Sequence, residues 1–247
     1  MQLEKWYADV VDGGCVSIHY RASLSLGLLE LAYRGQLGRT RHGSFSAGSA
    51  KSLPRIDGSP ARLLLMTDGG ALAWRDATSR PICLWSDGHR EVTWNPFVLN
   101  GAVEGAANGR GYAEQLRMTV APWRLGIDRL RWGRFCGDQH SLVWIVWEGR
   151  HPLRLVLLDG HAARLDNVTE DVVCVAPSAR LDLRERRLLV DETLGTGALA
   201  NMPWPKRIAP AAFLRGRERK WLAAGDLHVD GKSIDHGAVV CEKVEWS

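Results

Sequence analysis

The sequence predicts a mainly β protein whose antiparallel strands curl into one or two barrels. Two observations predict this fold class. Apolar residues recur at every second position over much of the chain, as they do in half-buried strands. Asp-Gly pairs lie between these runs and favour two-residue hairpin turns, because Asp tolerates a positive φ and Gly adopts one without steric cost. Six such pairs occur, beginning at Asp12, Asp57, Asp68, Asp87, Asp159 and Asp230.

The alternation places the strands in order along the chain. It is clearest over 15–26, where Val16 and Ile18 lie on one face and Ser17 and His19 on the other. We expect His19 to face solvent, since its neighbours on that face are polar. Many strands with short turns are typical of a barrel or of two packed sheets. The other main strands are expected at 28–37, 62–67, 71–76, 82–86, 90–94, 111–120, 127–136, 141–148, 153–158, 172–175, 179–184, 187–192 and 236–246.

A glycine-rich segment, EGAANGRG at 104–111, interrupts the strands. It divides the chain into an N-terminal barrel half, 1–105, and a C-terminal barrel half, 106–247; one continuous domain is the alternative. One helix is expected near 210–224, within the second half. Pro210 suits the first position of this helix and Gly225 suits its C-terminal cap.

Charge and composition argue against several classes of protein. The formal net charge is only +4, and basic residues are interspersed with acidic ones rather than gathered into the face that nucleic acid requires. The sequence contains no recognisable signal peptide or transmembrane span, so we expect a cytoplasmic protein. It does not indicate an oligomeric state. The 5 cysteines form no CxxC pair, and no HxxxH or Walker loop occurs. We therefore expect neither a metal nor another cofactor.

Residues 123–149 contain four of the 11 tryptophans. The run SLVWIVWE at 141–148 is apolar on both faces, so this strand is expected to be covered on both sides. The rings either fill the core of a barrel or line a cavity for an apolar ligand, where Arg134 would place a cation beside an aromatic wall. In the second case the residues that bind the substrate are Trp123, Trp132, Arg134, Trp144 and Trp147.

Two segments carry a family resemblance: EKWYADVVDGGCVSIHY at 4–20 and GRGYAEQLRMTVAPWRLGIDRLRWGRF at 109–135. They are similar to the group that contains carotenoid 1,2-hydratase (hydroxyneurosporene synthase) and tocopherol cyclase. The resemblance is best over 4–35 and 109–150, and it implies a lipocalin-like β-barrel with an elongated hydrophobic cavity. The residues that match the group's Gly-x-Gly-Tyr turn and its later Trp-bearing strand are Gly109, Gly111, Tyr112, Trp132, Gly133 and Arg134.

The chain departs from that group directly after the Gly-Tyr turn. The group typically carries a run rich in His, Asp and Asn there, whereas this chain has AEQLR at 113–117, with Glu114 as its one acidic residue. The hydratase or cyclase chemistry of the group therefore does not transfer residue by residue. The fold and the hydrophobic cavity are what the resemblance implies.

Hydration or cyclisation of an alkene needs a proton donor and a way to stabilise the resulting cation. A carboxylic acid in an apolar pocket stays protonated because desolvation raises its pKa, and aromatic faces stabilise cations. Glu114 is the candidate acid, and Tyr112 is the candidate that orients it or a substrate oxygen. The alternatives are a surface carboxylate paired with an arginine and a packed ring; Glu30 and Glu104 are the other candidate acids.

Two functions are compatible with these residues. The first is a cofactor-independent hydratase, cyclase or isomerase that acts on a terpenoid, a polyketide or a similar apolar molecule. The second is a non-catalytic lipocalin-like protein that binds a hydrophobic ligand. The changed residues after Tyr112 favour the binding protein, whereas the aromatic strands and Glu114 leave the enzyme open.

Overall fold

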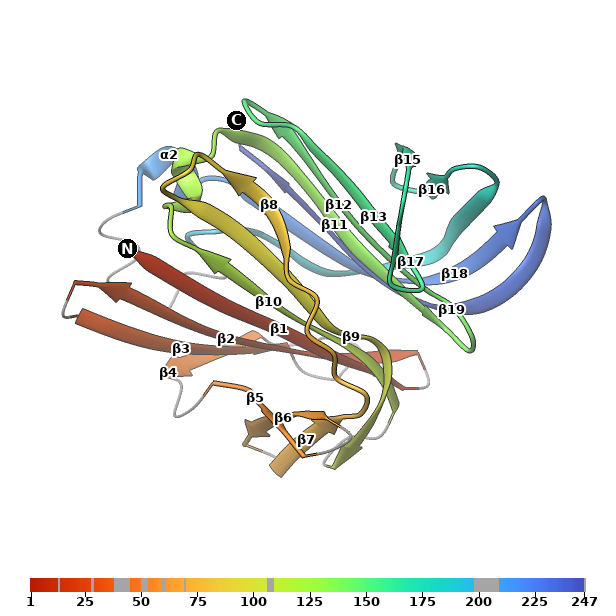
Figure 1. Cartoon of the computed structure of the whole chain (residues 1–247), viewed down its shortest axis with the longest axis horizontal. Coiled ribbons are helices and arrows are strands. Elements are labelled where there is room, and N and C mark those ends of the chain that lie inside the picture. The colour runs from red at the N-terminus through yellow and green to blue at the C-terminus, as the bar shows by residue number, and fades with distance from the viewer. Residues whose placement is uncertain are drawn as a thin grey trace. The chain divides into compact units, whose positions relative to one another are not determined.

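The computed structural model shows a mainly antiparallel β protein, as the alternation predicted. The chain divides into two compact units, Met1–Leu125 and Gly126–Ser247, and each unit contains one large sheet (Figure 1). No helix among the described residues is long and apolar enough to cross a membrane. The residues that the structure describes are 1–12, 14–27, 29–37, 45–49, 53–58, 61–68, 70–105, 109–197 and 209–246.

The division between the units lies later than the glycine-rich segment suggested. β9 (Glu91–Gly105) and β10 (Gly109–Met118) flank that segment and pair with each other, and β10 also pairs with β1 (Gln2–Asp12). The segment is therefore a hairpin connection inside the first sheet. The predicted halves, 1–105 and 106–247, are corrected to a division between Leu125 and Gly126, because β10 hydrogen-bonds with the first sheet.

The first sheet has the strand order β4-β3-β2-β1-β10-β9-β7-β6-β5, with β8 also paired with β9. Trp6 and Val10 of β1 share a core cluster with Leu63 and Leu65 of β6. Since β1 and β6 are not neighbours in the sheet, the sheet curls around this core in a barrel-like way. The strands not yet bounded are β2 (Cys15–Leu26), β3 (Leu29–Leu37), β4 (Phe45–Ser49), β5 (Arg55–Asp57), β6 (Arg62–Thr67), β7 (Gly70–Trp74) and β8 (Ile82–Ser86).

The polar face of β2 turns toward this core, not toward solvent. Ala8 of β1 pairs with His19, so both side chains lie on the core face. His19 is 3% exposed, its Nε2 lies 3.0 Å from Ser17 Oγ, and burial followed by the charge of Arg21 lowers its pKa to about 4. The expectation that His19 faces solvent is wrong. A polar barrel interior produces the same alternation as a solvated face.

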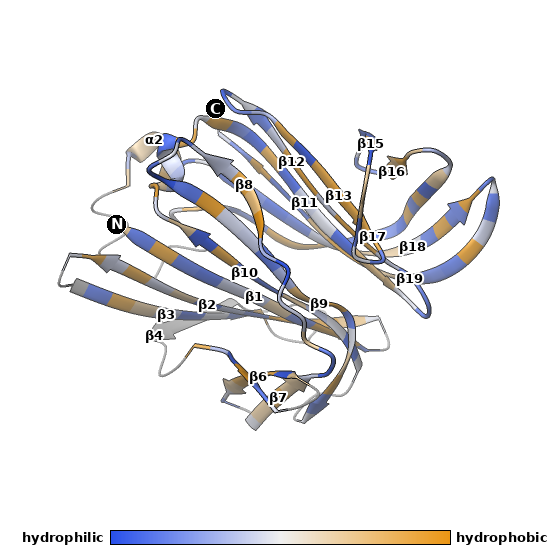
Figure 2. Cartoon of the chain, in the orientation of Figure 1, coloured by the Kyte–Doolittle hydropathy of each residue, from blue (hydrophilic) through white to orange (hydrophobic). Residues whose placement is uncertain are grey.

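The second sheet has the strand order β14-β13-β12-β11-β19-β18-β17-β16-β15. Figure 2 shows hydrophilic and hydrophobic residues alternating along its strands. Its core cluster includes Phe135, Trp144, Leu181 and Val239. Its strands are β11 (Ile127–Gly137), β12 (Ser141–Gly149), β13 (Leu153–Leu158), β14 (His161–Ala163), β15 (Leu165–Val168), β16 (Val172–Val175), β17 (Ala179–Thr193), β18 (Arg217–Val229) and β19 (Lys232–Glu245).

The helix expected near 210–224 is much shorter in the structure. α2 covers only Ala211–Leu214, and Arg217–Val229 forms strand β18, which pairs with β17 on one side and β19 on the other. Backbone hydrogen bonds to two neighbouring strands override the local helical pattern here. Gly225, expected as the helix cap, lies inside β18, where a Cβ would be 2.7 Å from Val239 Cγ2.

Candidate functional site

The pairing of β1 with β10 brings four candidate side chains onto one face of the first sheet. Tyr7 pairs with Glu114 and Asp9 pairs with Tyr112. Opposite residues of an antiparallel pair point to the same side, so these four side chains lie together. They face away from the core cluster, which takes the alternate residues of β1. With Trp94 of β9 they form what we call the carboxyl–tyrosine cluster.

Two short hydrogen bonds meet on a single oxygen of Glu114 in this cluster. The Tyr112 hydroxyl and the Trp94 Nε1 each donate to Glu114 Oε2 at 2.5 Å. Tyr112 is 0% exposed and Trp94 is 1% exposed, while Glu114 is half-buried. Burial, and next the charge of Glu114, raises the pKa of Tyr112 well above its ordinary value. Tyr112 therefore keeps its proton and acts as a hydrogen-bond donor to Glu114.

Asp9 is the second carboxylate of the cluster and is 0% exposed. Its Oδ2 accepts a hydrogen bond from the Tyr7 hydroxyl at 2.8 Å, and its Oδ1 accepts one from the Tyr112 backbone N–H at 3.2 Å. The ring of Tyr7 also contacts the rings of Tyr112 and Tyr20, with centroids 6.0 and 5.5 Å apart. One buried and one half-buried carboxylate thus lie among aromatic rings on this face.

Sequence reasoning found Glu114 and Tyr112 but missed Asp9, Tyr7 and Trp94. The sequence signal for Asp9 is an acidic residue within an apolar strand, because a carboxylate buried there requires hydrogen-bond partners. The other candidate acids do not belong to this cluster. Glu30 is exposed on β3, and Glu104 forms a surface ion pair with Arg75.

Of the five predicted substrate-binding residues, Trp123 belongs to the first unit, in the 3-10 turn Pro122–Arg124. The other four belong to the second unit. Strand pairing places Trp132, Arg134 and Trp147 on one face of the second sheet, whereas Trp144 lies on the opposite face, in the core cluster. All four are buried, and β12 is covered on both faces, as its sequence predicted. The predicted aromatic wall is therefore split between two faces.

Gly133 explains how Trp144 reaches its place. A Cβ at this position would lie 2.2 Å from Trp144 Cζ2, far inside contact distance, so the indole occupies the space left by the missing side chain. Behind this glycine, the face that carries Trp132 and Arg134 also carries Lys220, which is 1% exposed and ion-paired with Glu218 and Glu242.

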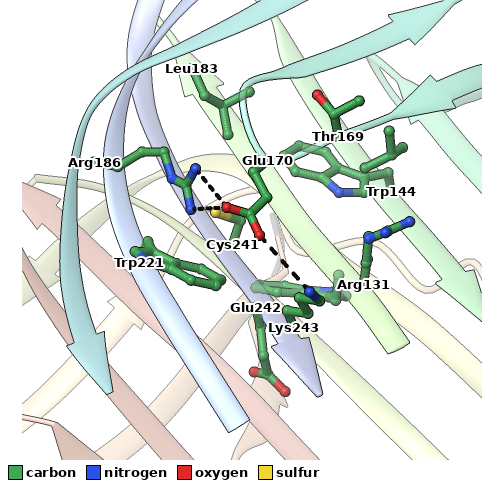
Figure 3. Close-up of a pocket in the computed structure, with 12 residues that line it drawn as sticks. Arg131, Trp144, Thr169, Glu170, Leu183, Arg186, Trp221, Cys241, Glu242 and Lys243 are labelled. Carbon is green, nitrogen blue, oxygen red and sulfur yellow. Dashed lines mark hydrogen bonds and ion pairs between the residues drawn. The ribbon is translucent and has the colours of Figure 1, made fainter. Parts of the chain in front are cut away.

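A small pocket lies on the core side of the second sheet, in the second unit (Figure 3). Trp132 and Trp144 line it, and Trp123, Arg134 and Trp147 are not among its lining residues. Its volume is about 30 Å³, enough for one or two water molecules and far below the volume of a typical ligand site. Among the described residues, no group of three His, Cys, Asp or Glu side chains is placed to hold a metal ion.

No protein-family model matches the chain, and no curated protein matches it. Solved structures do match. The structure of CghA with Sch210972 gives a TM-score of 0.64 at 10% identity, over 100% of this chain and 89% of that chain. Kievitone hydratase from Nectria haematococca gives 0.53 at 8% identity, over 98% and 88% of the two chains. A putative AttH from Nitrosomonas europaea gives 0.52 at 9% identity, over 100% and 93%.

These likenesses extend over both units of the chain. At 8 to 10% identity they establish the fold alone. The chain has the lipocalin-like fold of these proteins, with two barrel-like antiparallel sheets, as the resemblance at 4–35 and 109–150 implied.

Proposed function

We propose that this chain is a cofactor-independent enzyme of the hydratase, cyclase or isomerase type that acts on a hydrophobic, unsaturated small molecule. One observation carries the proposal: Glu114, a half-buried carboxyl group, receives two short hydrogen bonds on one oxygen from the buried donors Tyr112 and Trp94. The fold is compatible with such chemistry, since one of the similar structures bears the name kievitone hydratase.

The two donors determine which oxygen carries the transferable proton. A carboxyl oxygen has two lone pairs, and both lone pairs of Oε2 are engaged by Tyr112 and Trp94. A proton on Glu114 therefore resides on Oε1. In hydration, this proton passes to one carbon of a C=C bond, which leaves a carboxylate on Glu114 and a cation on the substrate. Water then bonds to the cation and returns one proton to Glu114; in cyclisation, another group of the substrate takes the place of water.

The same donors stabilise Glu114 after it has lost the proton. Hydrogen bonds that are already in place toward a developing negative charge lower the barrier without reorganisation. Tyr112 thus acts as a positioning residue in this scheme, because its raised pKa keeps it protonated and its hydroxyl contacts Glu114. Nearby ring faces, such as that of Tyr7, suit a substrate cation. Of the predicted substrate-binding residues, Trp123 belongs to the same unit as Glu114, whereas Trp132, Arg134, Trp144 and Trp147 of the second unit remain a separate prediction for an apolar ligand.

The test replaces Glu114 by glutamine, which retains the shape of the side chain and removes the acid. Wild-type protein is incubated in D₂O with a panel of unsaturated terpenoids and polyketides, and mass spectrometry detects carbon-bound deuterium in the product. We expect Glu114→Gln to fold normally and to lose at least about 100-fold in turnover. Glu104→Gln, at an exposed carboxyl group of the same unit, is the matched control and should retain turnover. Equal turnover in Glu114→Gln and wild type would remove Glu114 from the mechanism.

The second candidate function is a non-catalytic binding protein for a hydrophobic ligand. The indoles of Trp144 and Trp221, which line the small pocket of the second unit, favour it because indole faces suit apolar ligands, and such a ligand would need more room than the pocket now has. Native mass spectrometry of freshly purified protein distinguishes the two functions. A bound apolar molecule that gains no deuterium during incubation supports the binding protein.

A further inference from the structure

A carboxylate of the chain itself lies across the pocket of the second unit. Glu170 stands on the turn between β15 and β16, where the Thr169 hydroxyl accepts hydrogen bonds from the backbone N–H groups of Asp171 and Val172 at 3.2 and 3.1 Å. Figure 3 shows the Glu170 carboxylate pointing across the pocket toward Arg186 and Lys243. The Glu170 side chain is 51% exposed, so water reaches this ion pair.

Arg186 holds Glu170 with only part of its hydrogen-bonding capacity. Its two terminal nitrogens both contact Glu170 Oε2, at 3.1 and 3.2 Å, whereas a fork-like pair would use both carboxylate oxygens. One of these nitrogens also donates to Asp171 Oδ1 at 3.2 Å. Its Nε is buried and has no hydrogen-bond partner within the described part of the chain. The guanidinium lies over the ring of Trp221, with Cζ 4.9 Å from the ring centroid. Arg186 is therefore fixed in place with a donor unused.

The walls around Arg186 combine positive charge with indole surface. Lys243 Nζ lies 3.9 Å from Glu170 Oε1, and the lining also includes Arg131, Trp144 and Trp221. Cys241 adds no negative charge, because burial raises the pKa of its thiol to about 12. Asp171, Glu245 and Glu148 also pair with Arg186, Lys243 and Arg131, so without Glu170 the mouth would present partly compensated cations beside the indoles.

We propose that this pocket is a binding site for a small planar aromatic carboxylate, which replaces Glu170 on Arg186 and places its ring against the indoles of the pocket. Glu170 itself shows that the cations accept a carboxylate. At about 30 Å³ the pocket holds one or two waters while Glu170 lies across it, so an aromatic ring enters only as Glu170 leaves. Exposed ion pairs contribute little to stability, so the exchange costs little, while the buried ring adds apolar contact.

This site is separate from the carboxyl–tyrosine cluster, because every residue that lines it belongs to the second unit. The inference does not rest on the proposed proton transfer. Glu114→Gln should leave ligand binding at this pocket unchanged, so the two proposals succeed or fail independently.

The test titrates the protein with 1-naphthoate and follows the quenching of tryptophan fluorescence, with calorimetry to confirm stoichiometry. Naphthalene-1-carboxamide has the same shape without the charge and is the matched ligand control. We expect saturable binding of naphthoate and at least about tenfold tighter binding by Glu170→Gln, because the competing carboxylate is gone. Glu91→Gln makes the same charge change at an exposed position of the first unit and should bind as wild type does.

Variants of Arg186 complete the test. Arg186→Gln should abolish the binding of naphthoate, and Arg186→Lys, which retains the charge without the fork of donors, should weaken it. The proposal is overturned if Glu170→Gln binds no more tightly than wild type, or if the carboxamide binds as tightly as the acid. Binding that persists unchanged in Arg186→Gln also overturns it. If Arg186→Gln does not fold, the Glu170→Gln variant and the naphthalene-1-carboxamide control still test the proposal.

Discussion

Replacing Asp235 by asparagine is expected to destabilise the second unit through the hairpin that joins β11 and β12. Asp235 lies in β19, is 6% exposed, and accepts four backbone hydrogen bonds. Its Oδ1 receives those of Asp138 and His236 at 3.0 and 2.9 Å. Its Oδ2 receives those of Gln139 and His140 at 3.0 and 2.7 Å. One carboxylate thus accepts hydrogen bonds from the backbone N–H groups of three consecutive turn residues, 138–140.

The structure gives the size of the effect. Asparagine has one oxygen and one NH₂ group, so it can serve only one of the two pairs of N–H donors. The NH₂ group would then face two N–H groups, which lose their acceptor. A buried donor left without a partner costs about 1–3 kcal/mol. The predicted loss in the free energy of unfolding is therefore roughly 2–6 kcal/mol at pH 7, the sum over two such donors.

Urea unfolding followed by tryptophan fluorescence measures this loss, and Asp138→Asn, an exposed carboxylate of the same turn, is the control. Burial alone would raise the pKa of Asp235, but the backbone N–H groups of His140, Gln139, Asp138 and His236 outweigh it and hold the pKa below 3.8. The extra stability of wild type is therefore fully present above pH 3.8 and is lost as the pH falls through the lower, folded-state pKa. A variant as stable as wild type at pH 7 would refute the reasoning, as would a difference that does not shrink in acid.

Three further predictions concern single side chains. Gly133→Ala should destabilise the second unit by about 1–3 kcal/mol in urea unfolding, because the new methyl group overlaps the Trp144 indole. The double variant Gly133→Ala/Trp144→Phe should lose less unfolding free energy than the sum of the two single variants. The stability of wild type relative to His19→Gln, measured by urea unfolding, should fall by roughly 3 kcal/mol between pH 6.5 and pH 4, because the folded state disfavours protonated His19. A stability difference between the two proteins that stays constant over this pH range would contradict this. Trp94→Phe removes one hydrogen-bond donor to Glu114 and should lower turnover in the D₂O assay by about tenfold, with thermal stability unchanged. Unchanged turnover would exclude the Trp94–Glu114 hydrogen bond from the mechanism.

The turns and strands of this fold could be predicted because their signals are local. Four of the six Asp-Gly pairs are fully described, at Asp57, Asp87, Asp159 and Asp230, and each joins strands that pair with each other; Asp159 and Asp230 adopt φ values of 50° and 51°. β18 could not be predicted, because its strand conformation depends on hydrogen bonds to β17 and β19, which are distant in sequence. The same limit applies to His19, whose polar strand face resembles a solvated one.

The residues of the candidate site could likewise be predicted only in part. Glu114 and Tyr112 lie two residues apart on one strand, so a local motif could reveal them together. Trp94 and Asp9 reach them from neighbouring strands, and the strand pairing that brings them there leaves no mark in the local sequence. The alternation of the strand at 141–148 places Trp144 and Trp147 on opposite faces, but it cannot show that the Trp144 face holds the core cluster.

The pairing of early strands with late ones has a consequence for synthesis on the ribosome. In the first unit β1 pairs with β10, and in the second unit β11 pairs with β19. The first sheet can therefore be completed once Met118 has emerged, while the second unit is still being translated. The second sheet must wait for residues 232–245, and until then β11 exposes an unpaired edge. Nascent chains stalled before β19 should for this reason be the ones that need protection from edge-to-edge aggregation.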